Sequence, residues 1–275
     1  MIKASVLIPM FRAKYIAWLT MEGWCRQQDV NVEWELIIAE ETRCESFGEE
    51  NVMEYRKRLE EVGCVSLKYI PLIDWIPLGA KWKLLLEQIS DSSTLVFRDA
   101  ADIFSAPQRM TTLYSLYEEH PEGHWFVPVS FIVYSIEKDE SIIGDPEALL
   151  AMNPPRGDIG SVAVSANVIR KARLNMVSAK KNVDGVFRRA VMEAEPDLVI
   201  IRDLSDMWKY GISAHGFGNI SRRSHIFNNI HKSKKYYPLV PCPFDIRETI
   251  PSDILDRLKK SIKYIPLHIK EFLPE

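Results

Sequence analysis

The first part of the chain alternates short apolar runs with longer amphipathic segments. The apolar runs, four to eight residues long, lie at 4–9, 34–41, 65–72 and 94–97. Between them, apolar residues recur at helical spacing in the stretches 13–28, 49–62 and 80–89. Strands of this length that alternate with helices are typical of a parallel βαβ sheet. The pattern therefore predicts an α/β fold for this part of the chain.

Beyond residue 107 the pattern is less regular. It predicts helices at 109–119, 184–194 and 252–262, and strands at 125–134, 159–164 and 198–201. Within the first of these strands, Pro128 indicates an edge position, because proline has no N–H to donate to a neighbouring strand. The stretch 211–237 is rich in Gly, Ser, Asn, His, Lys and Arg, which predicts an irregular loop over a site.

Composition narrows the class of protein. With 47% hydrophobic and 27% charged residues, the 275-residue chain is neither a disordered segment, a collagenous repeat nor a disulfide-rich mini-protein. Its four cysteines form no C-x-x-C pair, which favours buried thiols and a reducing compartment. There is no run of 18 or more apolar residues and no signal-peptide pattern at the start. We therefore expect a cytoplasmic protein without a transmembrane segment.

The charge is unevenly distributed. Residues 1–137 contain 13 Lys/Arg and 21 Asp/Glu, a balance of −8, whereas residues 138–275 contain 22 and 17, a balance of +5. This asymmetry suggests different partners for the two halves, although solvated faces that happen to segregate would give the same counts.

Candidate chemistry follows three of the predicted strands. In an open parallel sheet, ligands bind beyond the carboxyl ends of the strands, and here those ends are followed by residues 10–14, 40–41 and 98–102. No glycine-rich loop follows the first strand, which argues against dinucleotide oxidoreductases, P-loop enzymes and sugar-nucleotide pyrophosphorylases. A diphosphate would then need positive charge from a divalent cation held by carboxylates. Asp99 and Asp102 can converge on one cation or on a ribose, and turn capping is the alternative.

Four runs together resemble the nucleotide-binding half of GT-A glycosyltransferases, particularly the inverting family 2. They read S-V-L-I-P-M-F-R, W-E-L-I-I-A-E-E, L-G-A-K-W-K-L-L-L and T-L-V-F-R-D-A-A-D-I-F-S-A-P-Q-R, and cover about residues 4–110. The resemblance implies a Rossmann-like GT-A fold, with a mixed, mostly parallel sheet flanked by helices. It implies a single domain over 1–275, in which 1–110 bind a nucleotide sugar and 111–275 build the acceptor site, with a basic loop and a helix near the C-terminus.

The resemblance also implies a set of donor-binding residues. These are Pro9, Phe11, Arg12, Glu40, Glu41, Lys81, Arg98, Asp99, Ala100 and Ala101. Glu40 matches the acidic residue that accepts a hydrogen bond from the nucleotide base, and Glu41 is its rival. Lys81 matches a basic helix residue that faces the nucleotide. Alternatively, Glu40 and Glu41 are surface charges at the end of a strand, and Lys81 is a solvated lysine on its helix.

Metal ligands and a catalytic base are implied in the same way. Asp102 matches the metal-binding aspartate and Asp99 the one on the ribose side, while Ala101 stands where many relatives have another carboxylate. Fewer anionic ligands lower the expected affinity for Mn²⁺ or Mg²⁺. Late-loop histidines are candidate further ligands, with His215 preferred over His225 and His231. The base is assigned to Asp184, with Asp158 in reserve, and an N-cap is the alternative role for Asp184.

The function implied is transfer of a sugar from a nucleotide-diphosphate donor, such as a UDP-sugar, to an acceptor hydroxyl. The implied transfer inverts the configuration at the anomeric carbon and uses a metal ion. Two alternatives stay open. Ala101 and the altered base motif suggest a sugar-nucleotide-binding or glycan-binding relative without activity. The positive second half suggests an anionic or nucleic-acid acceptor, bound by a basic late loop. That loop contains Arg222, Arg223, Lys232, Lys234 and Lys235.

Overall fold

The computed structural model describes residues 1–128, 132–136, 139–145, 147–148, 162–172, 183–203, 212–215, 239–243, 245, 247 and 249–261. Its larger sheet has the order β10-β6-β9-β4-β1-β2-β3. These strands are β1 (Ala4–Met10), β2 (Trp34–Glu41), β3 (Cys64–Leu72), β4 (Leu95–Arg98), β6 (Trp125–Pro128), β9 (Ala163–Ser165) and β10 (Ile200–Asp203). All neighbouring pairs in this sheet are parallel except those of β9, which runs antiparallel to β4 and β6. The predicted mixed, mostly parallel sheet is confirmed.

A second sheet has the order β12-β8-β7-β11-β5. Its strands are β5 (Ile103–Phe104), β7 (Ile132–Ser135), β8 (Glu140–Gly144), β11 (Ile212–His215) and β12 (Leu239–Pro241). The described helices are α1 (Ala17–Trp24), α2 (Glu49–Met53), α3 (Arg56–Glu61), α4 (Leu78–Leu86), α5 (Arg109–Glu119), α7 (Ala166–Ala172), α8 (Val183–Ala194) and α11 (Ser252–Ser261). None of the helices in the described ranges is long and apolar enough to cross a membrane.

Three predictions on secondary structure were wrong. The expected strand at 125–134 is two strands, β6 and β7, which belong to different sheets, and β6 has neighbours on both sides. Pro128 is the last residue of β6, where its missing N–H interrupts no interior pairing. The expected helix at 49–62 is divided into α2 and α3. The predicted loop at 211–237 contains β11, and the rest of that stretch lies outside the described residues.

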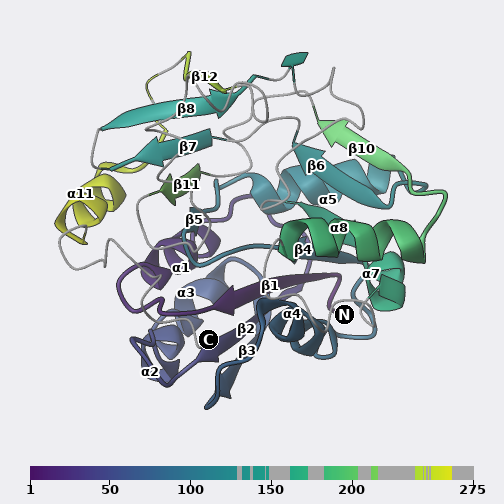
Figure 1. Cartoon of the computed structure of the whole chain (residues 1–275), viewed down its shortest axis with the longest axis horizontal. Coiled ribbons are helices and arrows are strands. Elements are labelled where there is room, and N and C mark those ends of the chain that lie inside the picture. The colour runs from purple at the N-terminus through teal and green to yellow at the C-terminus, as the bar shows by residue number, and fades with distance from the viewer. Residues whose placement is uncertain are drawn as a thin grey trace.

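Side chains of the larger sheet build two apolar cores, one on each face. Along β2, Leu36 and Ile38 belong to the first core, and Ile37 and Ala39 belong to the second, because successive strand residues point to opposite faces. Helices α1, α2, α3 and α5 contribute to the first core and cover what we call the α1 face. Helices α4, α7 and α8 contribute to the second and cover the α4 face, where Figure 1 shows them grouped together.

Helix α1 packs unusually close to the chain that follows β4. A Cβ atom added at Gly23 would lie 2.5 Å from the backbone nitrogen of Ser105. Only glycine therefore allows this approach, which brings the helix against β5 and Ser105.

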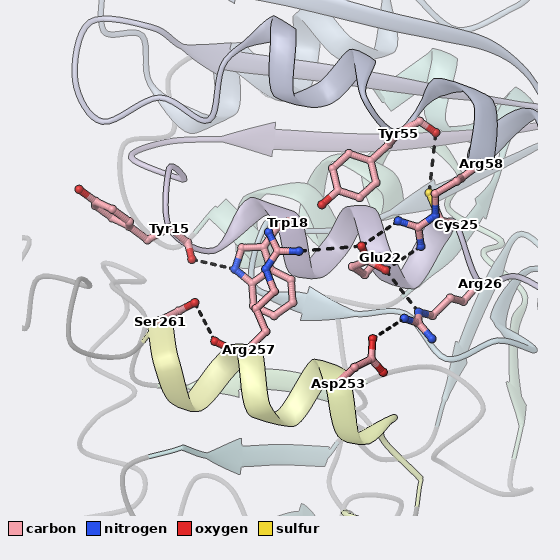
Figure 2. A network of polar contacts seen from close by, with 10 residues as sticks. All are labelled: Tyr15, Trp18, Glu22, Cys25, Arg26, Tyr55, Arg58, Asp253, Arg257 and Ser261. Atoms are coloured by element: carbon pink, nitrogen blue, oxygen red, sulfur yellow. Dashed lines mark hydrogen bonds and ion pairs between the residues drawn. The ribbon is translucent and has the colours of Figure 1, made fainter.

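Helix α11 joins the end of the described chain to α1 through a network of charged side chains (Figure 2). Its apolar side chains Ile254, Leu255 and Leu258 are buried in the first core. At the centre of the network, Arg58 of α3 donates two hydrogen bonds, of 2.9 and 2.7 Å, to the two carboxylate oxygens of Glu22 on α1.

Two arginines extend this network toward α11. Arg26 lies 3.4 Å from Glu22 and 2.8 Å from Asp253 of α11. Arg257 of α11 lies over the ring of Trp18 and has a nitrogen 4.0 Å from Glu22. Burial alone would raise the pKa of Glu22, but the hydrogen bonds and charges of Arg58 and Arg26 lower it below its ordinary value.

The substitution Glu22→Gln tests this network. We expect it to destabilise the fold by about 1–2 kcal/mol near neutral pH, because the arginines lose a charged acceptor. Since the pKa of Glu22 is lowered on folding, this stabilisation is complete above about pH 4.5 and is lost as the pH falls through the folded-state pKa. Urea unfolding at several pH values measures the difference, which should be constant around neutrality and shrink in acid.

Asp253→Asn is the matched control, because the side chain of Asp253 is 65% exposed and its ion pair with Arg26 is solvated. We expect this control to change the free energy of unfolding by less than about 0.5 kcal/mol. A difference between wild type and Glu22→Gln that persists unchanged below pH 4 would contradict the assigned charge interaction.

Candidate functional site

The loops that follow β1, β2 and β4 meet at the carboxyl edge of the parallel strands. The loop after β1 is held to the loop after β2 by a hydrogen bond of 2.9 Å from Lys14 N–H to the carbonyl of Glu45. Asp99 N–H donates to the carbonyl of Leu7 in β1, at 3.1 Å. Arg12 has a φ of 49°, in the left-handed region that side chains other than glycine rarely adopt. The sequence-predicted residues therefore lie at one edge of the sheet, where an open α/β fold binds ligands.

Glu40, the last but one residue of β2, points to the α1 face and is bound within the fold. The N–H groups of Phe47 and Gly48 donate to its two carboxylate oxygens at 2.6 and 2.9 Å. The hydroxyl of Tyr69 on β3 donates to the carboxylate at 2.7 Å, and Glu40 is fully buried. Burial, followed by the hydrogen bond to Glu40, raises the pKa of Tyr69. The carboxylate of Glu40 thus fixes the loop after β2.

Asp99 also points to the α1 face and forms a buried ion pair with Arg109 of α5, at 3.0 Å. The same carboxylate oxygen accepts hydrogen bonds of 2.6 Å from Trp24 Nε1 and 2.9 Å from the hydroxyl of Ser105. Its other oxygen accepts a hydrogen bond from Ala100 N–H at 2.8 Å. The structure therefore places Asp99 in the frame that joins β4, α1 and α5.

On the opposite face, Glu41 and Lys81 form a buried pair. Lys81 Nζ lies 4.0 Å from Glu41 Oε2, donates to the carbonyl of Met10 at 3.1 Å, and lies over the ring of Phe11. Burial lowers the pKa of Lys81 to about 8, against the opposing effect of the nearby carboxylates. Within the part of the chain that the structure describes, the buried Glu41 Oε2 has no hydrogen-bond partner. This acceptor is available to a ligand.

Arg98 lies on the same face as Glu41 and Lys81 and extends this set of polar side chains toward α8. Its guanidinium lies 4.9 Å from the ring centroid of Trp82 on α4 and 4.8 Å from that of Phe187 on α8. The buried Nε1 of Trp82 has no hydrogen-bond partner among the described residues. Arg98, the last residue of β4, thus lies on the α4 face, and Asp99, which follows it, lies on the α1 face.

Asp102 lies directly before β5 and is buried. β5 pairs in antiparallel fashion with β11, Ile103 opposite Ser213, so the start of β5 lies beside the end of β11. That end is His215, whose side chain lies outside the described residues. The pairing of β5 with β11 therefore brings Asp102 and the backbone of His215 close together.

Asp102 has a carboxylate, which is a ligand type that Mn²⁺ and Mg²⁺ bind. Ala101 has no side-chain ligand to offer, and the described residues contain no group of three His, Cys, Asp or Glu side chains able to hold a metal.

The structure describes the remaining predicted residues only in part. Pro9, Phe11, Arg12 and Ala100 lie at the same edge and are partly exposed, and Ala101 packs against the first core. Asp184 is the second residue of α8, and its side chain lies outside the described residues. Asp158, His225, His231 and the five basic late-loop residues also lie outside them.

Sequence reasoning did not identify Trp82 and Phe187 as part of this site. Trp82 stands next to Lys81 in the run L-G-A-K-W-K-L-L-L, so an aromatic residue beside a candidate ligand was an available signal. Phe187 gave no such signal, because its contact with Arg98 depends on how α8 crosses the sheet. The arrangement as a whole offers fixed cations, an acceptor carboxylate and aromatic rings, which suit an anionic ligand with a planar polar base.

Of the comparisons with known proteins, the one with solved structures found matches. No protein-family model matches the sequence, and no curated protein matches it either. Among solved structures, S. aureus TarS is similar with a TM-score of 0.57 and 13% identity over 78% of this chain and 37% of that one. This chain thus spans well under half of TarS.

Two further solved structures contain ligands. TarS 1–349 in complex with UDP-GlcNAc has a TM-score of 0.60 and 13% identity over 79% of this chain and 60% of that one. The mannosyltransferase PcManGT from Pyrobaculum calidifontis, in complex with GDP-Man and Mn²⁺, has a TM-score of 0.52 and 10% identity over 94% and 69% of the two chains. At these identities the likeness concerns the fold, and the chain has the GT-A fold of glycosyltransferases.

Proposed function

We propose that this protein is a glycosyltransferase that moves a sugar from a UDP-sugar to an acceptor hydroxyl. The observation that carries the proposal is the polar group on the α4 face, where Glu41, Lys81 and Arg98 lie at the ligand-binding edge of a GT-A fold. In that fold, TarS 1–349 is seen with UDP-GlcNAc and with UDP, and PcManGT with GDP-Man.

The chemistry of Glu41 and Lys81 suits a uracil base. Glu41 Oε2 has no hydrogen-bond partner among the described residues and accepts a hydrogen bond, and the ammonium group of Lys81 donates one. Uracil presents an N–H next to a carbonyl oxygen, which complements such a pair. Glu41 therefore takes the role first assigned to Glu40, whose carboxylate is already bound by Phe47, Gly48 and Tyr69.

The reaction requires positive charge at the leaving diphosphate and a base at the acceptor. Asp102 and His215 would hold Mn²⁺ or Mg²⁺, which supplies positive charge to the diphosphate when bound. Asp184, at the start of α8, accepts the proton of the acceptor hydroxyl as its oxygen attacks the anomeric carbon from the side opposite the nucleotide. Such an in-line attack inverts the configuration at that carbon. We propose a single domain, with the nucleotide bound by residues 1–110.

A nucleotide-sugar-binding protein without activity is the second candidate. It is favoured by Ala101, which has no carboxylate, and by Asp99, whose carboxylate is bonded to Arg109 and Ser105. Asp102 is then the described carboxylate of this motif that could bind a cation. Release of UDP from UDP-GlcNAc, with Mn²⁺ and a range of acceptors, distinguishes the two. An enzyme turns over, and Asp184→Asn slows it, whereas a binding protein binds UDP tightly without turnover.

Glu41→Gln should weaken binding of UDP about tenfold and leave the fold intact, because a neutral amide is a poorer acceptor than a carboxylate. Isothermal titration with UDP and with UMP measures the affinity. Glu50→Gln, at an exposed position of α2, is the control and should bind UDP as wild type does. If Glu40→Gln weakened UDP binding in a folded protein and Glu41→Gln did not, the assignment of the base to Glu41 would be wrong.

Asp99→Asn, by contrast, should destabilise the fold rather than weaken binding of UDP. It leaves the buried Arg109 without its ionic partner, so we expect a loss of about 3–5 kcal/mol in the free energy of unfolding. Urea unfolding measures this loss. A stable Asp99→Asn protein with impaired UDP binding would instead make Asp99 a ligand of the donor.

Binding of UDP should weaken as the pH rises through about 8. Lys81 has a lowered pKa of about 8, so above that pH the free protein carries a neutral amine, which is a weaker hydrogen-bond donor to the uracil carbonyl than an ammonium group. Titration of UDP between about pH 6.5 and 9.5 measures the effect. Lys81→Arg stays charged throughout, and its affinity should vary little over this range, whereas an equal fall in both proteins would exclude Lys81 as the cause.

Affinity for the metal ion should decrease when either proposed ligand is removed. We expect Asp102→Asn and His215→Ala each to raise the Mn²⁺ concentration that half-saturates UDP release by about tenfold or more, because each removes one protein ligand. His225→Ala and His231→Ala are matched controls from the same late part of the chain. Activity that needs no divalent cation in the wild type would remove the metal from the mechanism.

A further inference from the structure

The indole N–H of Trp82 is a buried donor that has no hydrogen-bond partner among the described residues. Trp82 lies on α4 and is 2% exposed. Its ring is held in place by the ring of Phe187, with centroids 5.8 Å apart, and by the guanidinium of Arg98, 4.9 Å from its centroid. Buried polar groups are nearly always hydrogen-bonded, so this fixed donor indicates an acceptor that comes from a bound molecule.

Three other tryptophans of the chain show the usual arrangement. Trp18, Trp24 and Trp34 are also buried. Each donates its Nε1–H to a carbonyl or carboxylate oxygen of the protein, at 3.0, 2.6 and 2.9 Å, respectively. The unpaired indole of Trp82 is therefore a property of its place in the fold and not of buried tryptophans in this protein.

Helix α4 lies over the ends of three neighbouring strands. Lys81 reaches the ends of β1 and β2, through the carbonyl of Met10 and the carboxylate of Glu41. Trp82 reaches the end of β4, through Arg98. Since β1 lies between β2 and β4, the ends of β2 and β4 are about two strand spacings apart, roughly 10 Å.

A nucleotide with its base at Glu41 runs along this edge toward Trp82. On the other side of β2 the sheet ends with β3, whereas β1 and β4 continue the edge. In a nucleotide the ribose separates the base from the phosphates, so the phosphate nearest the ribose falls close to the end of β4.

The charges beside Trp82 suit a phosphate. The guanidinium of Arg98 lies over the indole ring, and the ammonium of Lys81 stands one residue earlier on α4. Two positive charges favour an anionic acceptor over a neutral one, because they attract its charge.

We propose that Trp82 is a specificity-determining residue of the donor site, and that its Nε1–H donates a hydrogen bond to an oxygen of the phosphate nearest the ribose. This inference rests on the proposed function, in which Glu41 binds the uracil base. The N–H is covered in the free protein, so the phosphate reaches it through the side-chain rotamer changes that commonly accompany binding. Trp82 thus distinguishes a nucleotide from a nucleoside, which has no charged acceptor at this distance from its base.

Trp82→Phe removes the N–H and keeps an aromatic ring beside Arg98. We expect the affinities for UDP and for UMP to fall about tenfold, because a hydrogen bond to a charged acceptor is lost, and the affinity for uridine to change less than about twofold. Isothermal titration in the presence of EDTA measures all three affinities without any contribution from a divalent cation.

Trp34→Phe is the matched control, because it removes the same atoms elsewhere. Trp34 is fully buried at the start of β2, on the edge of the sheet opposite to the site, and its Nε1–H donates to the carbonyl of Val62. We expect Trp34→Phe to bind UDP as wild type does. It should also lower the midpoint of urea unfolding more than Trp82→Phe, because it gives up a hydrogen bond within the protein.

A second variant keeps the shape of the indole and tests the hydrogen bond even if Trp82→Phe does not fold. In it the indole of Trp82 is replaced by a benzothiophene, which has the same bicyclic shape and a sulfur atom in place of the N–H. We expect weaker binding of UDP and UMP, unchanged binding of uridine and a wild-type urea midpoint.

Three results would overturn this inference and leave the proposed function in place. Wild-type affinity for UDP in the benzothiophene variant would show that no ligand uses the N–H. An equal loss for uridine and UDP would assign the N–H to the base or the ribose. A urea midpoint of the benzothiophene variant well below that of wild type would show a partner within the protein. Failure of the wild-type protein to bind UDP, by contrast, would refute the proposed function itself.

Discussion

Consecutive polar residues at the carboxyl ends of two strands point to opposite faces of the sheet, because the side chains of a strand alternate with a period of two. In β2 this alternation separates Glu40 from Glu41, and at the end of β4 it separates Arg98 from Asp99. One member of each pair lies on the α1 face and is bonded within the protein. The other lies on the α4 face, beside Lys81 and Trp82. The division between framework and candidate site depends on this geometry.

The framework on the α1 face has a clear physical role. A buried ion pair costs free energy to desolvate, and it persists only when its remaining hydrogen bonds are satisfied. Asp99 meets this requirement through Trp24, Ser105 and Arg109, which come from α1, the chain before α5, and α5 itself. Together with the close approach of Gly23 to Ser105, this ties α1 and α5 to the end of β4. The fixed edge of the sheet is a precondition for a site with defined geometry.

The α4 face contains the candidate site. Two of its buried polar atoms, Glu41 Oε2 and Trp82 Nε1, have no hydrogen-bond partner among the described residues. Buried polar groups are nearly always hydrogen-bonded in proteins, and exceptions concentrate where a ligand or water completes the set. These atoms lie beside a lysine whose pKa is lowered to about 8 and an arginine held between aromatic rings. Such a concentration of unsatisfied and charged groups is expected of a binding site rather than of a core.

The sequence by itself determined the order of strands and helices in the first half, the carboxyl edge where polar residues gather, and the resemblance to GT-A glycosyltransferases. Those features follow from local periodicity and from residues close together along the chain. It could not decide which acid of a pair serves the fold, because that depends on partners far away in sequence, such as Tyr69 for Glu40 and Arg109 for Asp99. Nor could it place Arg98 between Trp82 and Phe187, or set the end of β11 beside Asp102, since both contacts arise only when helices and strands from the two halves pack together.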